Sequence, residues 1–61
     1  TGLARQLLAA LIDVARERQL AVMQGVTLAT NGRMLKLARA LGFEVRPDPE
    51  DDELMAMRLE L

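Results

Sequence analysis

The stretch NGRMLKLARALGF at residues 31–43 decides how this 61-residue chain folds, because each of its ends carries a signal for the limit of a helix. Asn31 is a residue type that caps helix N-termini, since its side-chain oxygen can accept a hydrogen bond from a free amide of the first turn. Apolar residues then recur at helical spacing, and Gly42 is the residue type that most often ends a helix in the left-handed conformation. The stretch predicts a helix over residues 32–41.

The segment before this helix changes to a period of two. Apolar side chains of residues 21–30 fall on both faces, with Val22, Val26 and Leu28 on one and Met23, Thr27 and Ala29 on the other. This pattern is typical of a strand that is covered on both sides. Gly25 predicts a bulge or a close backbone approach, with a ligand contact as the less favoured interpretation. Downstream, residues 43–46 and 54–61 are predicted to form two further strands.

The chain opens on a second amphipathic helix, predicted over residues 3–19 with Thr1 or Gly2 at its N-cap. Its apolar positions are spaced by three and four, at Leu3, Leu7, Leu8, Leu11, Val14 and Ala15. No internal repeat or low-complexity linker interrupts the sequence. Residues 1–61 therefore read as one unit with the order helix, strand, helix, strand, strand.

Composition excludes several classes of chemistry. The sequence has no Ser, Cys, His, Tyr or Trp, so Ser-His-Asp or Cys-His nucleophiles, imidazole bases and zinc sites cannot be built from it. A net charge of −1 and a single Phe argue against a nucleic-acid or membrane surface. No apolar run is long enough to span a bilayer, and no signal segment opens the chain. We expect a soluble, cytoplasmic protein without nucleic-acid or membrane partners.

Charge is unevenly distributed along the chain. Residues 1–45 carry six basic and three acidic side chains, a net +3, whereas residues 46–61 carry two basic and six acidic ones, a net −4. An anionic ligand is therefore expected on the first part. The acidic run 48–53 lacks the alternating ligands of a calcium loop and predicts a solvated hairpin loop, so no metal site is expected. Basic residues of the second helix predict an exposed face rather than a DNA-recognition helix; they are Arg33, Lys36 and Arg39.

The opening stretch TGLAR at residues 1–5 has a glycine and a small residue two apart at a helix start, where free amides favour phosphate. By itself this pattern is more typical of a turn. Together with residues 31–43, at this separation, it resembles the GNAT superfamily of acyl-CoA-dependent acyltransferases. That family has a loop Arg/Gln-x-x-Gly-x-Gly/Ala before a long helix, then a strand, then a helix Asn-x-x-(small or Met)-x-x-Leu-x-x-x-x-Gly-Phe. The matching positions here are Gly2, Ala4, Asn31, Met34, Leu37, Gly42 and Phe43.

The resemblance implies an α/β chain of the α+β kind, a single partial domain corresponding to the C-terminal half of the family fold. Helices 3–19 and 32–41 would cover a three-stranded mixed sheet. Strand 54–61 would lie between strands 21–30 and 43–46, antiparallel to both. Strand 21–30 would keep an unpaired edge where the preceding strand of the family lies.

The function that the resemblance implies is acyl transfer from acetyl-CoA or another acyl-CoA to an amine, either a small molecule or a protein lysine. The implied CoA-binding residues are Gly2, Leu3, Ala4, Arg5 and Asn31. The first four would hold the pyrophosphate with their amides. Asn31 would lie near the pantetheine or thioester, or act only as an N-cap, and the two roles are compatible. Residues 34–38 are most similar to domains that modify protein lysines.

The sequence also departs from the family pattern. The first Arg/Gln of the loop would lie before Thr1, and the strand that often carries a catalytic glutamate is absent. Ala38 stands where many members have a tyrosine acid. No catalytic residue is therefore assigned, and the 61-residue chain alone is expected to be inactive. The alternative is a non-catalytic half-domain that serves as an oligomerisation or interaction module.

The small size of the chain makes a partner necessary. A chain of 6.7 kDa has a small core, and without Cys or His it has neither a disulfide framework nor a zinc site to stabilise it. An apolar edge at residues 21–30 is an aggregation hazard unless something pairs with it. We therefore expect a homo-oligomer, or pairing with the missing N-terminal half.

Overall fold

The computed structural model describes residues 2–61 and contains two helices and three strands. In chain order they are α1 (Leu3–Glu17), β1 (Val22–Leu28), α2 (Gly32–Ala40), β2 (Glu44–Pro47) and β3 (Leu54–Glu60). All five predicted elements are present in the predicted order. Their ends differ from the predictions by up to two residues. Thr1, one of the two predicted N-cap residues of α1, lies outside the described residues, and Gly2 occupies the N-cap.

The sheet has the strand order β1-β3-β2, and β3 runs antiparallel to both neighbours. The predicted central position of residues 54–61 is confirmed. The prediction of a mixed sheet is wrong, because β1 and β2 are separated by β3 and every pair that forms is antiparallel. The protein is therefore an α+β chain with an open, three-stranded antiparallel sheet.

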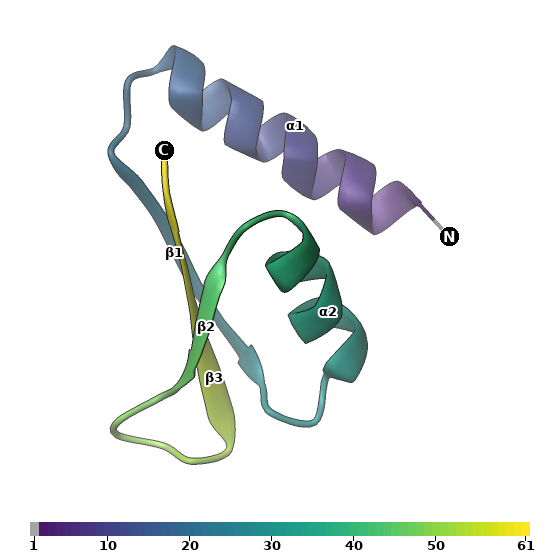
Figure 1. Cartoon of the computed structure of the whole chain (residues 1–61), viewed down its shortest axis with the longest axis vertical. Coiled ribbons are helices and arrows are strands. Elements are labelled where there is room, and N and C mark those ends of the chain that lie inside the picture. The colour runs from purple at the N-terminus through teal and green to yellow at the C-terminus, as the bar shows by residue number, and fades with distance from the viewer. Residues whose placement is uncertain (1) are drawn as a thin grey trace.

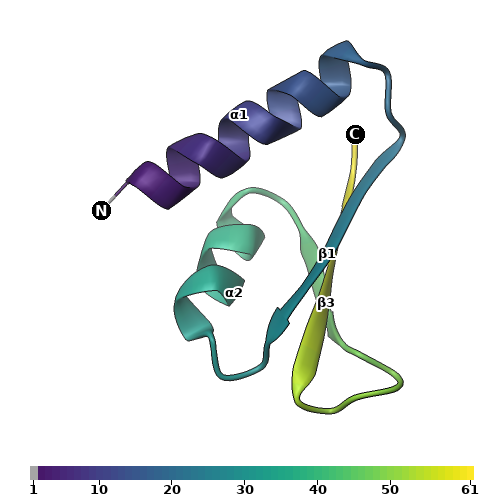
Figure 2. The same ribbon diagram turned by 180° about the vertical axis from the view of Figure 1, so that it is seen from behind.

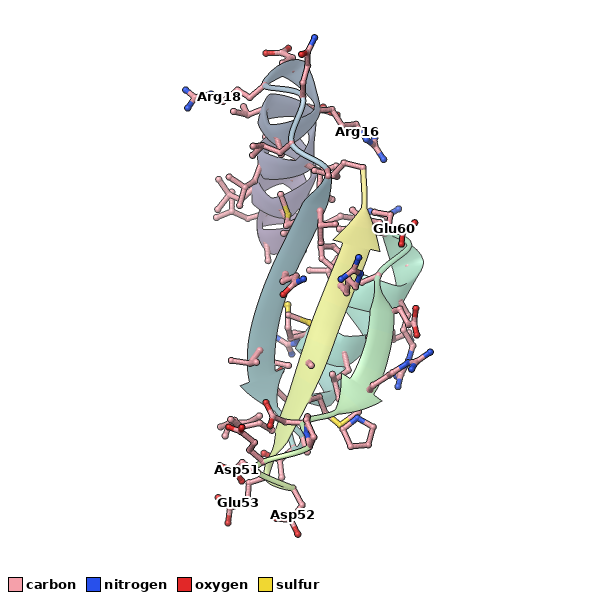
Figure 3. The ribbon with its side chains drawn as sticks, turned by 90° about the vertical axis from the view of Figure 1, so that its left-hand side faces the viewer. Arg16, Arg18, Asp51, Asp52, Glu53 and Glu60 are labelled. Atoms are coloured by element: carbon pink, nitrogen blue, oxygen red, sulfur yellow. The ribbon has the colours of Figure 1, made fainter. Side chains whose placement is uncertain are left out.

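Both helices lie on the same face of the sheet (Figures 1 and 2). Six apolar residues are buried between the layers: Ile12, Ala15, Leu35, Ala38, Phe43 and Leu59. On the opposite face Val26 and Leu28 remain 58% and 56% exposed. Figure 3 looks onto this outer face, with the strands side by side and the helices behind them. The expectation that residues 21–30 are covered on both sides is therefore wrong for the described chain.

Helix α1 ends two residues earlier than predicted because the chain turns at Gln19, which has a φ of 59°. The amide of Gln19 donates to the carbonyl of Arg16 at 3.0 Å, and the amide of Leu20 donates to that of Ala15 at 3.1 Å. These two bonds form a Schellman motif, in which a left-handed residue satisfies the last carbonyls of the helix. Gln is an uncommon residue at such a position, so no residue type in this part of the sequence indicates the turn.

Helix α2 begins and ends as predicted from its two signal residues. The side-chain oxygen of Asn31 accepts from the amide of Met34 at 3.1 Å. Gly42 has a φ of 97°, and the amide of Phe43 donates to the carbonyl of Ala38 at 2.9 Å. Phe43 and Ala38 also belong to the same buried cluster. The helix terminus and the core are thus fixed by the same two residues.

Gly25 forms no bulge. Strands β1 and β3 pair without interruption from Val22 opposite Glu60 to Leu28 opposite Leu54, with Gly25 opposite Met57. A Cβ at Gly25 would meet the Cε atom of Met57 at 3.7 Å, which is an ordinary contact. The predictions of a bulge and of a close backbone approach are therefore wrong.

The acidic segment between β2 and β3 is a hairpin loop, as predicted. The Asp48 Oδ1 atom accepts from the amide of Glu50 at 2.8 Å, and the Asp51 Oδ1 atom accepts from that of Glu53 at 2.9 Å. Two of the carboxylates therefore close local turns of the backbone.

Candidate functional site

The first turn of α1 presents free backbone amides. The first amides of any helix have no partner within it, and among residues 2–61 no side chain caps this one. Gly2 stands at the N-cap, and no atom lies within 4 Å of the place where its Cβ would be. The positive end of the helix dipole adds to the attraction for an anion. This end of α1 is therefore open to close approach by an anionic group.

A hollow of about 420 Å³ lies between α1, α2 and the sheet. Its lining is almost entirely apolar and is formed by Ala4, Leu7, Leu8, Leu11, Met23, Gln24, Gly25, Met34, Ala38, Phe43 and Met57. The first turn of α1 contributes Ala4, and the first turn of α2 contributes Met34. The hollow thus connects the starts of the two helices. Gly25 leaves its floor open, because the residue has no side chain.

The five residues expected to bind CoA occupy three kinds of place. Ala4 lines the hollow, whereas Gly2, Leu3 and Arg5 are exposed at the start of α1 and do not line it. Leu3 is 63% exposed. Asn31 stands before the first turn of α2, outside the lining, and its Nδ2 atom donates to the Thr27 hydroxyl oxygen at 3.3 Å. The Oδ1 atom of Asn31 accepts from the Met34 amide at 3.1 Å, so the N-cap role of Asn31 is present in the structure.

Sequence reasoning missed the hollow itself. Leu7 and Leu11 were predicted only as apolar positions of the helix at residues 3–19, and Met57 only as part of the strand at residues 54–61, so no pocket was expected between them. The signal that points to the hollow is the width of the apolar surface of α1, which includes Leu3, Leu7, Leu11 and Val14 in addition to the buried Ile12. A helix that packs on one face of one small sheet cannot bury so wide a surface.

Acid–base groups are absent from the lining of the hollow. Every Arg and Lys in the described chain is exposed, and the two ion pairs, Arg46 with Glu44 and Arg58 with Glu60, lie on the outer face of the sheet. Ala38, at the position where the resemblance places a tyrosine in many family members, is fully buried and carries no polar atom on its side chain. The arrangement can hold an apolar group, but the lining formed by residues 2–61 has no acidic or basic side chain, and Gln24 is its one hydrogen-bonding side chain.

Comparison with known proteins gives no further assignment. No family model matches the chain, and no curated protein matches it. Across the described residues, no three Asp or Glu side chains come together in a way that could hold a metal ion. None of the described helices has both the length and the apolar character needed to cross a membrane.

Proposed function

We propose that this chain is the C-terminal half of a GNAT-type acyltransferase domain and provides part of its acyl-CoA site. The parent enzyme transfers an acyl group from acyl-CoA to an amine. The observation that carries the proposal is the shared hollow, with the uncapped start of α1 at Ala4 and the start of α2 at Met34 both opening onto it. An amphipathic thioester needs this combination, since its pyrophosphate is anionic and its acyl end is apolar.

The residues of the chain would divide the binding between them. The first four amides of α1 would hold the pyrophosphate, because such amides have no partner in the helix and lie at its positive end. They are those of Gly2, Leu3, Ala4 and Arg5. Asn31 would cap α2 by accepting a hydrogen bond from the Met34 amide, while its side-chain amide group lies near the pantetheine. Acyl-CoA supplies the thioester that the substrate amine attacks. Direct attack needs no enzyme nucleophile, in agreement with a chain that has no Ser or Cys.

The chain would need its N-terminal complement for catalysis. It contains no base for the amine, and the buried Ala38 cannot protonate the departing thiolate. The strand order β1-β3-β2 leaves one edge of β1 open, where the preceding strand of the parent domain would pair. The base for the amine and the acid for the thiolate would then both lie in the part of the parent domain that precedes this chain. The 61-residue chain alone would be inactive.

Calorimetry with CoA tests the proposal. We expect a version of the protein extended upstream through the preceding strand to bind CoA and to consume acetyl-CoA in the presence of an amine. The 61-residue chain should show no turnover, whatever its affinity. If the extended protein neither binds CoA nor consumes acetyl-CoA, the proposal is wrong.

The Asn31→Asp variant separates the two roles of this residue. Aspartate keeps the acceptor oxygen that caps α2, so the melting temperature should change little. It loses the Nδ2 donor and adds a negative charge, so CoA affinity of the extended protein should fall if Asn31 lies near the cofactor. Unchanged affinity would leave Asn31 with the capping role alone.

A second candidate function is a non-catalytic interaction module. The observation that favours it is the exposed apolar surface on α1 and β1, including Leu7 at 64% and Val26 at 58% exposure. A chain that assembles firmly but whose extended version does not bind CoA would have this function instead.

A further inference from the structure

The chain exposes more surface than a compact protein of its mass. Its accessible area is 4761 Å², against about 3,900 Å² expected for a folded 6.7 kDa monomer. The difference, about 850 Å², is close to the ~800 Å² that each partner buries in a stable protein–protein interface. The accessible area in excess of that expected for a compact monomer is therefore about the area that one partner buries in a stable interface.

Apolar side chains account for much of this surplus. Seven large apolar residues are between 44% and 64% exposed, namely Leu3, Leu7, Leu11, Val14, Leu20, Val26 and Leu28. Four of them form one stripe along α1. Leu7 and Leu11 in that stripe also line the hollow together with Gln24 and Gly25 of β1. The stripe and β1 thus belong to one continuous surface.

Strand β1 also has a free hydrogen-bonding edge. Just outside the two ends of β1, the amide of Ala29 donates to the carbonyl of Glu53, and the amide of Leu61 donates to the carbonyl of Ala21. The odd-numbered residues between Ala21 and Ala29 are therefore the ones whose backbone groups bond to β3. Because such bonds alternate along an antiparallel pair, the backbone groups of Val22, Gln24 and Val26 point away from β3. Within residues 2–61 these outward groups have no backbone partner. Figure 3 shows β1 as one outer strand of the sheet.

The two edges of the sheet differ in how well they are protected. The β2 edge is four residues long and carries Glu44, Arg46 and Pro47, which are features that discourage strand pairing. The β1 edge is seven residues long and has no charge and no proline. Of the two edges, only that of β1 therefore has the length and the uncharged side chains that favour pairing with another strand.

We propose that two copies of this chain pair through β1, in antiparallel fashion about a two-fold axis at Gln24. This register places Gln24 opposite Gln24 of the second copy and Val22 opposite Val26 of the second copy. It uses the outward groups of all three residues and places no like charges opposite each other. The axis runs perpendicular to the sheet, so both copies keep their helices on the same face and the α1 stripes approach each other.

A second copy fits this surface better than an unrelated partner. A two-fold interface needs a surface that is complementary to itself, and an uncharged antiparallel edge meets that requirement. In a longer parent chain the preceding strand would take the same edge. The pairing is therefore a property of the 61-residue chain, and it is tested by mass rather than by CoA binding.

Sedimentation equilibrium of three forms of the chain tests the pairing. The unmodified chain should sediment at twice 6.7 kDa at micromolar concentration. Gln24→Lys and Gln24→Glu should each raise the dissociation constant by about tenfold or more, because they place like charges directly opposite each other. An equimolar mixture of these two variants should recover the dimer mass, because opposite charges then meet at the axis.

Gln6→Lys provides the matched control, because it makes the same chemical change at an exposed position of α1 that does not line the hollow. This variant should remain dimeric. In the dimer the amides of Val22, Gln24 and Val26 should exchange with solvent slowly. An unmodified chain that sediments as a monomer at micromolar concentration, or a mixture of the two Gln24 variants that stays monomeric, would overturn the proposal. Gln24 variants that dimerise as well as the unmodified chain would also overturn it.

Discussion

Individual residues at the helix ends do much to fix this fold. Asn31 and Gly42 delimit α2 through a side-chain cap and a left-handed turn, and both roles follow from residue type. Gln19 performs the same turn for α1, with a φ of 59°, although a side chain disfavours that conformation. The sequence therefore predicted the limits of α2 closely. It extended α1 by two residues because nothing in a glutamine indicates a left-handed turn.

Replacing Gly42 by alanine should destabilise the protein by about 1–2 kcal/mol, because a Cβ disfavours the left-handed region. The new Cβ would meet the Leu59 Cδ1 atom at 3.6 Å, an ordinary contact, so the cost lies in the backbone. Gly32→Ala is the matched control, since a Cβ there meets nothing within 4 Å and the φ of Gly32 is not positive. Thermal denaturation at fixed protein concentration measures both. Equal melting temperatures for the two variants would contradict this account.

The Gln19→Gly variant should have the opposite effect. Glycine relieves the cost of the left-handed residue but loses more entropy on folding, so we expect a net stabilisation of about 0.5–1 kcal/mol. Urea denaturation measures the change. A destabilised variant would mean that the side chain of Gln19 contributes more than its backbone conformation costs.

At the scale of elements, periodicity predicted which segments are helices and strands but not what covers them. The apolar surface of α1 is wide enough to pack against two other surfaces. In the structure α1 packs against one, and the residues that it buries there are Ile12 and Ala15. The same holds for β1, whose apolar outer face carries Val26 and Leu28. A pattern of apolar residues shows that a face is to be buried, and only the arrangement of the other elements shows by what.

Gly25→Ala should stabilise β1 by about 0.4–1 kcal/mol, since alanine restricts the unfolded chain and the strand is regular at this point. The added methyl group would contact Met57 without a clash. Thermal denaturation measures the gain. A loss of stability would indicate that the floor of the hollow has less room than the distance of 3.7 Å suggests.

As a whole molecule, the protein is a thin slab that measures 33 × 28 × 12 Å. Its radius of gyration is 11.7 Å, compared with about 10.5 Å for a compact chain of this length. One layer of helices on one sheet leaves the outer face bare. This shape goes with a small core, since six residues of the described chain, 2–61, are buried.

The candidate site could be predicted only in part. The sequence predicted the start of α1 and the cap at Asn31, because glycine and asparagine influence the backbone of the residues next to them in the chain. The hollow between the helices depends on how α1 lies relative to α2, which no local pattern determines. The absence of a catalytic acid and base is what the resemblance implies, from Ala38 and from the preceding strand of the family, and it stays a prediction.

The proposed anion site at the start of α1 is tested most directly by the CoA affinity of two glycine variants of the extended protein. Gly2→Asp and Gly2→Asn put side chains of almost the same size at the N-cap of α1, where no atom lies within 4 Å of the new Cβ, and only aspartate adds a negative charge. Isothermal calorimetry should show that CoA binding is weaker by about tenfold or more in Gly2→Asp than in Gly2→Asn, because the carboxylate repels the pyrophosphate. Equal affinities for the two variants, with both proteins folded, would contradict a pyrophosphate site at the start of α1.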